Sequence, residues 1–96
     1  MPSRTLSAEA EDDYRNIFDF GVERFGVEQA LTYLLGMDAL LDTLPETPLI
    51  HPQVGEEAFR RAVYKSHVIY FKVTKEDHVL IVRIIGRQAF PRSSHP

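Results

Sequence analysis

The sequence predicts an α+β fold in which an antiparallel helical hairpin packs on a small, mainly antiparallel β-sheet. Two amphipathic helical patterns follow each other in the first half of the chain, separated by a single glycine. Three runs of β-branched and aromatic residues follow in the second half, with short polar breaks between them. With 96 residues, 44% of them hydrophobic and 26% charged, the chain is expected to form a single domain over residues 1–96.

A short extended segment at residues 4–6 is followed by a helix predicted over residues 8–25. Ser7 suits the N-cap position, because its hydroxyl can accept a hydrogen bond from an amide of the first turn. Several acidic residues follow, close to the positive end of the helix dipole. Gly26 can adopt the left-handed backbone that ends a helix. The apolar stripe of this helix consists of Ala10, Tyr14, Ile17, Phe18, Gly21 and Phe25.

A second helix is predicted over residues 27–44, where Pro45 ends it. The connection through Gly26 is so short that the two helices must run antiparallel. Leu31, Leu35 and Leu40 flank the main stripe, so the apolar arc is wider than one contact surface requires. This width favours a second neighbour for the helix. The main stripe consists of Val27, Ala30, Tyr33, Leu34, Met37, Leu41 and Leu44.

Residues 45–55 contain three prolines and one glycine, which predicts a connecting loop without regular structure. Strands are then predicted over residues 59–64, 67–74 and 79–85. The breaks between them are long enough only for hairpin turns, so the strands should form an antiparallel meander. The tail over residues 86–96 has little to order it.

The last two predicted strands are apolar on both faces, because His67 to Thr74 and Val79 to Ile85 do not alternate with polar residues. A sheet with helices on one side should be polar on its other side. A buried central strand would explain the pattern in the third strand, and a permanent partner would explain it in both. Strict alternation places Val79, Ile81 and Ile85 on one face and Leu80, Val82 and Ile84 on the other.

Arg83 interrupts the most apolar of these runs. A charge in that position costs free energy unless it has a partner or reaches water. Its methylene groups can extend to an edge of the sheet and leave the guanidinium hydrated. Alternatively, Arg83 belongs to a basic side of the sheet that meets an acidic partner.

The net charge of −3 hides a strong asymmetry along the chain. Residues 1–57 carry three Arg against twelve Asp or Glu, which gives −9, and residues 58–96 carry +6. Such a division of charge influences which partners the protein binds and how electrostatic attraction steers them toward it. The overall sign argues against direct, sequence-specific nucleic-acid binding. The absence of cysteine, of a signal peptide and of any membrane-length apolar run predicts a cytoplasmic protein that does not bind membranes.

Motifs for catalysis or cofactor binding are missing from the sequence. His51, His67, His78 and His95 show no metal-ligand spacing, so no metal site is expected, and each is expected on the surface or in a loop. The isolated glycines form no phosphate-binding loop, so no cofactor is expected. The acidic residues near Ser7 are explained by the start of a helix, which leaves no catalytic residue to assign.

Three stretches together resemble one family. Residues 7–20 are similar to the first helix of ParE toxins, with Ala, spaced acids and an aromatic residue. Residues 24–30 resemble that family's turn between the helices, and residues 66–73 and 79–87 resemble its last two strands and the basic start of its tail. The resemblance extends over about residues 5–88 in the expected order. The chain is therefore identified as a member of the ParE branch of the RelE/ParE superfamily.

This resemblance implies the toxin of a type II toxin–antitoxin pair, of the kind associated with plasmid stabilisation, with a helical hairpin on a small, curved, mainly antiparallel sheet. It also implies a ParD-like antitoxin whose C-terminal segment wraps the toxin, in a hetero-oligomeric complex, and DNA gyrase as the target. The RelE branch instead cuts messenger RNA on the ribosome. A toxin that has lost its activity and retains only antitoxin binding is a third alternative.

The sequence favours the gyrase branch. RelE-like nucleases use several Arg or Lys and a tyrosine near the C-terminus, because phosphodiester cleavage requires charge stabilisation and proton transfer. Here His67 and Gln88 stand where that branch has Arg, and no tyrosine follows Phe90. His67 could still serve as a base, so the nuclease alternative stays open. The chain also departs from common ParE toxins at Gly86, where a histidine is frequent, and in its final five residues.

The resemblance and the basic second half together suggest two sets of contact residues. Residues expected near the target are Arg83, Arg87, Gln88, Phe90 and Arg92. Residues expected to contact the antitoxin are Leu31, Leu35, Arg60, Arg61, Val68 and Tyr70.

Overall fold

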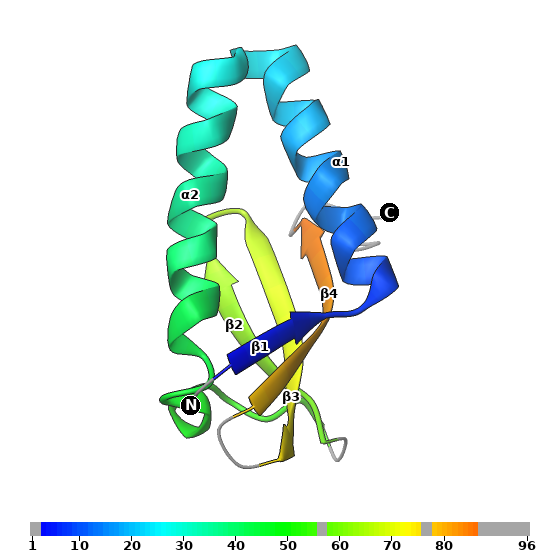
Figure 1. The fold of residues 1–96 in the computed structure, drawn as a ribbon, viewed down its shortest axis with the longest axis vertical. Helices are drawn as coiled ribbons and strands as arrows, with labels where there is room; N and C mark the ends of the chain where they lie inside the picture. Colours follow the sequence, from blue (N-terminus) through cyan, green and yellow to red (C-terminus); the bar gives the residue numbers. More distant parts are fainter. Residues whose placement is uncertain (1–2, 56–57, 76–77, 87–96) are drawn as a thin grey trace, which may run out of the picture.

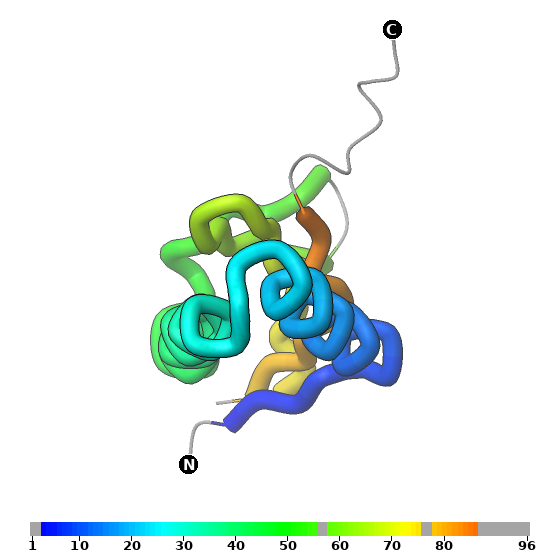
Figure 2. The backbone as a smooth tube through the Cα atoms, turned by 90° about the horizontal axis from the view of Figure 1, so that it is seen from above, coloured from blue at the N-terminus to red at the C-terminus, as the bar shows by residue number. Residues whose placement is uncertain are grey.

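The computed structural model describes residues 3–55, 58–75 and 78–86. The two helices form an antiparallel hairpin that lies against one side of the sheet (Figures 1 and 2). The predicted α+β fold is therefore confirmed. In chain order the elements are β1 (Ser3–Leu6), α1 (Ala8–Phe25), α2 (Val27–Thr43), the short 3-10 helix η1 (Pro48–Ile50), β2 (Arg60–Tyr64), β3 (His67–Lys75) and β4 (His78–Gly86).

Within the described residues, the sheet has four strands in the order β1-β4-β3-β2. The last three form the predicted antiparallel meander. The extended segment at the start of the chain is a strand that pairs in parallel with β4, with Ser3 opposite His78 and Leu6 opposite Ile81. Because β1 ends at Leu6, it covers only the first part of the outer edge of β4.

Both helices have nearly the predicted bounds, and a close approach between them fixes the hairpin. Gly26 has a φ of 95° and separates α1 from α2. A Cβ at Gly21 would lie 3.1 Å from the Cβ of Ala30, so the helices are in contact there. The end of α2 at Thr43, one residue before the predicted end, leaves Leu44 as its cap.

Ser7 joins the start of α1 to the sheet. Its Oγ accepts a hydrogen bond from the Ala10 amide at 3.0 Å, and its hydroxyl donates to the Val82 carbonyl oxygen at 2.8 Å. The predicted N-cap is therefore confirmed. The same side chain also binds a backbone carbonyl group on the edge of β4, beyond the end of β1.

Replacing Ser7 with alanine is expected to lower the free energy of unfolding by about 1 kcal/mol, because the cap and one carbonyl partner are lost. Ser7→Thr keeps the hydroxyl and is the matched control, with a smaller expected loss. Urea unfolding followed by circular dichroism measures both variants. Equal losses in the two variants would show that the hydroxyl is not responsible.

The proline-rich segment is more regular than predicted. Residues Pro48–Ile50 form η1, and Gln53 makes an isolated antiparallel bridge to Arg60. The Arg61 amide donates to the Pro52 carbonyl oxygen at 3.1 Å. The prediction of a loop without regular structure is therefore wrong for these residues, because proline fits the first position of a short helix.

A bulge in β4 changes which side chains face the helices. Tyr70 pairs with Arg83 and Phe71 pairs with Ile81, so Val82 has no opposite residue on β3. One extra residue reverses the alternation that follows it. Ile84 therefore joins Val79 and Ile81 in the core, and its predicted placement on the opposite face is wrong.

The core lies between the hairpin and the sheet. Met37, Leu41 and Leu44 come from the second half of α2 and its cap, and they pack with the inner side chains of β3 and β4. Phe71 is the largest fully buried side chain. The remaining buried residues of this cluster are Ala10, Ala62, Ile69, Val79, Ile81 and Ile84.

Candidate functional site

Exposed apolar side chains gather on the hairpin more than on the strands. On the described strands, Val63 and Val73 are the exposed large apolar residues. Tyr70, Leu80, Val82 and Ile85 are half-buried, so part of the predicted apolar surface of the sheet remains accessible. Leu49 and Ile50 in η1 are exposed as well. On α1 and α2, five large apolar residues are between 49% and 62% exposed: Phe20, Phe25, Val27, Leu31 and Leu35.

A groove of about 950 Å³ opens where the hairpin, the β2–β3 turn and the end of β4 come together. These elements meet in the upper half of Figure 1. The α1 wall contributes apolar and aromatic side chains, and the opposite wall contributes the polar turn. The lining residues are Ile17, Phe20, Gly21, Arg24, Phe25, Gln29, Ala30, Thr32, Tyr33, Gly36, Tyr64, Lys65, Ser66, His67 and Gly86.

The Tyr33 hydroxyl forms hydrogen bonds with the polar groups that line this groove. It lies 2.8 Å from Nδ1 of His67 and 3.3 Å from Oγ of Ser66. The Ser66 amide donates to it at 3.3 Å. Its ring packs edge-on against Tyr64, with ring centres 5.1 Å apart. These contacts fasten α2 to the β2–β3 turn and fix the shape of the groove.

His67 is half-buried in β3, so the expectation of a surface or loop histidine is wrong for this residue. Burial lowers the pKa of His67 below its ordinary value. The imidazole is therefore neutral at pH 7 and serves as a hydrogen-bond partner of Tyr33. Sequence reasoning did not identify this pair, because Tyr33 fits the apolar stripe of its helix without any polar partner.

Arg83 is paired with Asp13 from α1. The guanidinium donates to the two carboxylate oxygens at 2.7 and 3.0 Å, and the Ile84 amide donates to the same carboxylate at 2.9 Å. Asp13 thus takes the place of a neighbouring strand on the part of β4 that β1 leaves uncovered. The Arg83 side chain remains 46% exposed. It therefore reaches an edge of the sheet, as the first alternative predicts, and also has an internal partner.

The pKa of Asp13 reflects this arrangement. Burial alone would raise the pKa, but the hydrogen bonds from Arg83 and Ile84 and the charge of Arg83 outweigh it, and the pKa is lowered. The carboxylate is therefore ionised over the physiological range. The interpretation of Asp13 as an ordinary acid of a helix start is incomplete, because no local pattern shows a partner 70 residues away.

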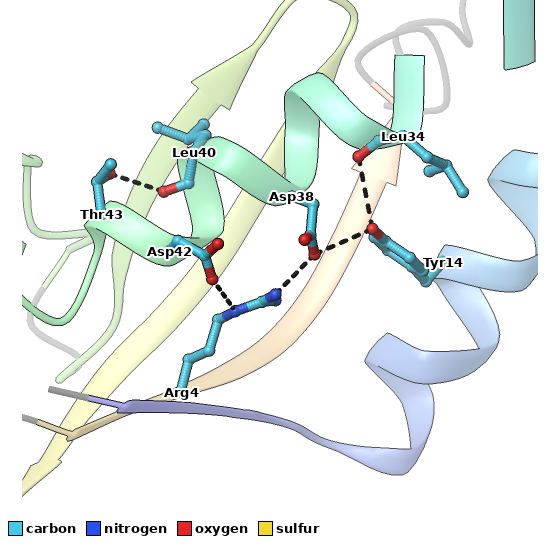
Figure 3. A network of polar contacts seen from close by, with 7 residues as sticks. All are labelled: Arg4, Tyr14, Leu34, Asp38, Leu40, Asp42 and Thr43. Carbon is cyan, nitrogen blue, oxygen red and sulfur yellow. Dashed lines mark hydrogen bonds and ion pairs between the residues drawn. The ribbon is translucent and has the colours of Figure 1, made fainter. Parts of the chain in front are cut away.

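A second charged network joins β1 to α2 (Figure 3). Arg4 donates to Asp38 at 2.6 Å and to Asp42 at 2.9 Å, one helical turn apart. Tyr14 donates to Asp38 at 3.2 Å. Burial and the negative charge of Asp38 raise the pKa of Tyr14 to about 12. This network is structural, because it connects three elements away from the groove.

The remaining predicted contact residues occupy different surroundings. Leu31 and Leu35 are exposed on α2. Arg60 is half-buried and donates to the His51 carbonyl oxygen at 2.8 Å, whereas Arg61 is exposed opposite the half-buried Tyr70. Val68 is only 3% exposed, so it offers a partner almost no surface. The predicted target residues Arg87, Gln88, Phe90 and Arg92 lie outside the described residues.

No helix in the described part of the chain is long and apolar enough to cross a membrane. No group of three or more His, Cys, Asp or Glu side chains in residues 3–55, 58–75 and 78–86 could hold a metal ion.

Comparisons with known proteins agree with one another. Residues 5–89 match the model of the family described as ParE toxin of type II toxin–antitoxin system, parDE. The chain is 30% identical over 99 residues to Toxin ParE1 of Caulobacter vibrioides, a match that covers 97% of each chain. It is also 30% identical over 91 residues to Toxin ParE1 of Mycobacterium tuberculosis, which covers 92% of this chain and 93% of that protein.

The fold also matches a solved structure. A chain of the chromosomal ParDE TA system from P. aeruginosa superposes with a TM-score of 0.78 at 21% sequence identity. The match covers 90% of this chain and 96% of the other. At this identity the similarity concerns the fold.

Proposed function

Because the chain belongs to the ParE toxin family of type II toxin–antitoxin systems, we propose that it is a toxin that a ParD-like antitoxin neutralises and that poisons DNA gyrase. The observation that carries this proposal is the family match over residues 5–89, together with relatives that align along more than nine-tenths of both chains. The proposal places the protein in the cytoplasm, where gyrase acts, and gives it a binding mode of action without catalysis.

The surface of the hairpin supports an antitoxin partner. Val27, Leu31 and Leu35 follow one another at four-residue spacing along α2 and are all exposed. A row of this kind is typical of a face that receives another protein. We therefore keep Leu31 and Leu35 as antitoxin contacts and extend the set to Val27, with Arg61 and Tyr70 as candidates on the sheet.

The surroundings of His67 argue against the nuclease alternative. In a nuclease of the RelE branch this position would carry an arginine for charge stabilisation. The structure instead ties a neutral, half-buried imidazole to Tyr33 at 2.8 Å, in a contact that joins α2 to the sheet. A structural role of this kind explains the residue without chemistry on RNA.

The direct test is a supercoiling and cleavage assay with purified gyrase and purified toxin. We expect the toxin to inhibit supercoiling and to stabilise cleaved DNA. If it does neither, the gyrase assignment is lost. Primer extension on translated messages tests the alternative, since cuts within codons would support a ribosome-dependent ribonuclease. Harmless expression of the isolated chain would favour a module that only binds antitoxin.

Among the predicted target contacts, Arg83 lies within the described residues. Arg83→Ala is expected to weaken gyrase inhibition about tenfold or more, because one charge-assisted contact is removed. Arg15→Ala is the matched control, since Arg15 is an exposed arginine of α1 that pairs with Asp12. Circular dichroism verifies the fold of both variants. Unchanged inhibition by a folded Arg83→Ala variant would remove Arg83 from the target surface.

A further inference from the structure

A single tyrosine hydroxyl joins α2 to three residues at the β2–β3 turn. The Tyr33 hydroxyl oxygen lies 2.8 Å from Nδ1 of His67 and 3.3 Å from Oγ of Ser66. It also lies 3.4 Å from the carbonyl oxygen of Tyr64. The turn contains Lys65 with a φ of 51°, a left-handed backbone that costs free energy for a residue with a Cβ. A turn of this kind keeps its shape only where its surroundings hold it.

The distances indicate how the hydrogen bonds of this cluster are arranged. The Tyr33 oxygen accepts the Ser66 amide hydrogen at 3.3 Å, and the hydroxyl has one hydrogen of its own to donate. Nδ1 of His67 is the nearest acceptor, so the neutral imidazole accepts at Nδ1 and carries its hydrogen on Nε2. An imidazolium donates from both ring nitrogens and cannot accept. Protonation of His67 therefore leaves the hydroxyl only the more distant oxygens of Ser66 and Tyr64, at 3.3 and 3.4 Å.

The surroundings of His67 are unfavourable for a positive charge. The imidazole packs edge-on against the Tyr33 ring, with ring centres 5.5 Å apart. A Cβ at Gly86 would lie 3.8 Å from Nε2, so the end of β4 lies close to the other ring nitrogen. Among the described residues that line the groove there is no carboxylate to pair with an imidazolium. The titratable and charged residues that line the groove with His67 are Tyr33 from α2, Tyr64 from β2, Lys65 from the turn and Arg24 from α1.

We propose that Tyr33 and His67 form an acid-sensitive latch, in which the neutral imidazole holds α2 against the β2–β3 turn and protonation opens this contact. Burial lowers the pKa of His67, which is the direction that such a latch requires. A histidine whose pKa is lowered in the closed form stabilises that form fully above the ordinary value of 6.5. This stabilisation is lost as the pH falls below that value, so the latch is closed at neutral pH and opens in mild acid.

Opening of the latch stays local, because α2 is held at other points as well. Leu41 in the second half of α2 is fully buried in the core. In the first half, Ala30 packs against Gly21 of α1 and keeps the hairpin together. Between these points Tyr33 packs edge-on against Tyr64, with ring centres 5.1 Å apart, and both rings line the groove. Separation of the turn from α2 therefore changes the shape of the groove. The latch belongs to the isolated chain and does not depend on which partner the toxin meets.

The test is hydrogen exchange of single backbone amides in the full chain, followed by NMR at several pH values. The Ser66 amide reports on the latch because it donates to the Tyr33 hydroxyl, and the Leu41 amide reports on the core. We expect the protection factor of the Ser66 amide to fall several-fold from about pH 7.5 to about pH 5.5, after correction for the intrinsic exchange rate. The limit of this change is about tenfold, since the lower pH is about one unit below the ordinary pKa of histidine. The Leu41 amide should keep its protection.

Three variants test which group titrates. His67→Asn keeps a side-chain acceptor near the position of Nδ1 but does not titrate, so the protection of the Ser66 amide should no longer change with pH. Tyr33→Phe removes the hydroxyl and keeps the ring, and it should lower this protection at every pH. His78→Asn is the matched control, because this second histidine contacts Ser3 and Thr5 of β1 and not α2. It should retain the wild-type dependence on pH.

The latch is overturned if the protection of the Ser66 amide does not change with pH in the wild type, or if His67→Asn or Tyr33→Phe retains the wild-type change. Parallel loss of protection at Ser66 and Leu41 would mean that acid unfolds the whole domain, which also contradicts a local latch. The comparison of these two amides in the wild type needs no substitution, so a variant that fails to fold does not prevent the decision.

Discussion

Gly36→Val is expected to destabilise the protein by about 3 kcal/mol, at the upper end of what overpacking costs in a close-packed interior. A Cβ at Gly36 would lie 2.0 Å from the Tyr64 hydroxyl oxygen and 3.0 Å from Cζ of that ring. Tyr64 cannot easily move away, because its ring packs edge-on against Tyr33. Either the ring leaves this position or α2 moves away from the sheet, and the groove changes shape in both cases.

Gly36→Ala gives the clearer test, because the sign of its effect on the free energy of unfolding depends on the contact with Tyr64. In an exposed helix, replacing glycine with alanine stabilises by about 1 kcal/mol, so a loss of stability here identifies the contact with Tyr64 as its cause. Tyr64→Leu removes the atoms that the new Cβ would meet. In that background Gly36→Ala should be neutral or stabilising when unfolding is followed in urea. Destabilisation of equal size in both backgrounds would show that Tyr64 is not the obstacle.

This contact also illustrates where sequence reasoning stops. Local patterns predict both helices to within one residue and the three strands of the meander to within one residue at each end, because caps, glycine and polar breaks act on their neighbours. Gly36 sits inside a helical pattern and carries no local sign of the tyrosine that lies over it. Its role depends on a strand that begins about 24 residues later.

The sheet shows the same division between local and long-range effects. The sequence predicts the meander, but it does not show that β1 pairs in parallel with β4 or that Val82 forms a bulge. Both features depend on register between distant segments. The bulge decides whether Ile84 is buried, so a strict count of alternate residues assigns it to the wrong face.

The candidate site was predictable only where it depends on the apolar pattern of one helix or on the distribution of charge along the chain. Of the three residues in the wide apolar arc of the second helix, Leu31 and Leu35 are exposed, whereas Leu40 packs against the core. The charge asymmetry indicates a two-sided molecule, but it does not reveal that Arg24, in the acidic half, shares a groove with Lys65. A cation–π contact such as that of Arg24 with Phe20, four residues apart on α1, is the one local signal that could have identified this wall.

Asp13→Ala is expected to lower the free energy of unfolding by about 2 kcal/mol, within the range for hydrogen bonds that involve a charged group. The Asp13 side chain is only 13% exposed and accepts three hydrogen bonds, two from Arg83 and one from the Ile84 amide. Arg83 can regain water because it is 46% exposed, so most of the loss comes from the amide on the open edge of β4. Asp13→Asn keeps an oxygen for that amide and should lose about half as much free energy, since the hydrogen bond remains without the charge.

The dependence on pH distinguishes charge from shape. The pKa of Asp13 in the folded protein lies below the value of about 3.9 for an unfolded aspartate, so the folded state favours the ionised form. Its charge-dependent contribution to stability is therefore complete above about pH 4 and is lost as the pH falls through the folded pKa. Unfolding free energies of wild type and Asp13→Asn should differ at pH 7 and converge as the pH is lowered toward about 2. A difference that stays constant over this range would mean that the asparagine side chain of Asp13→Asn disturbs the packing of α1 on β4. Convergence would show that the negative charge of Asp13 holds Arg83, and with it the end of β4, in place.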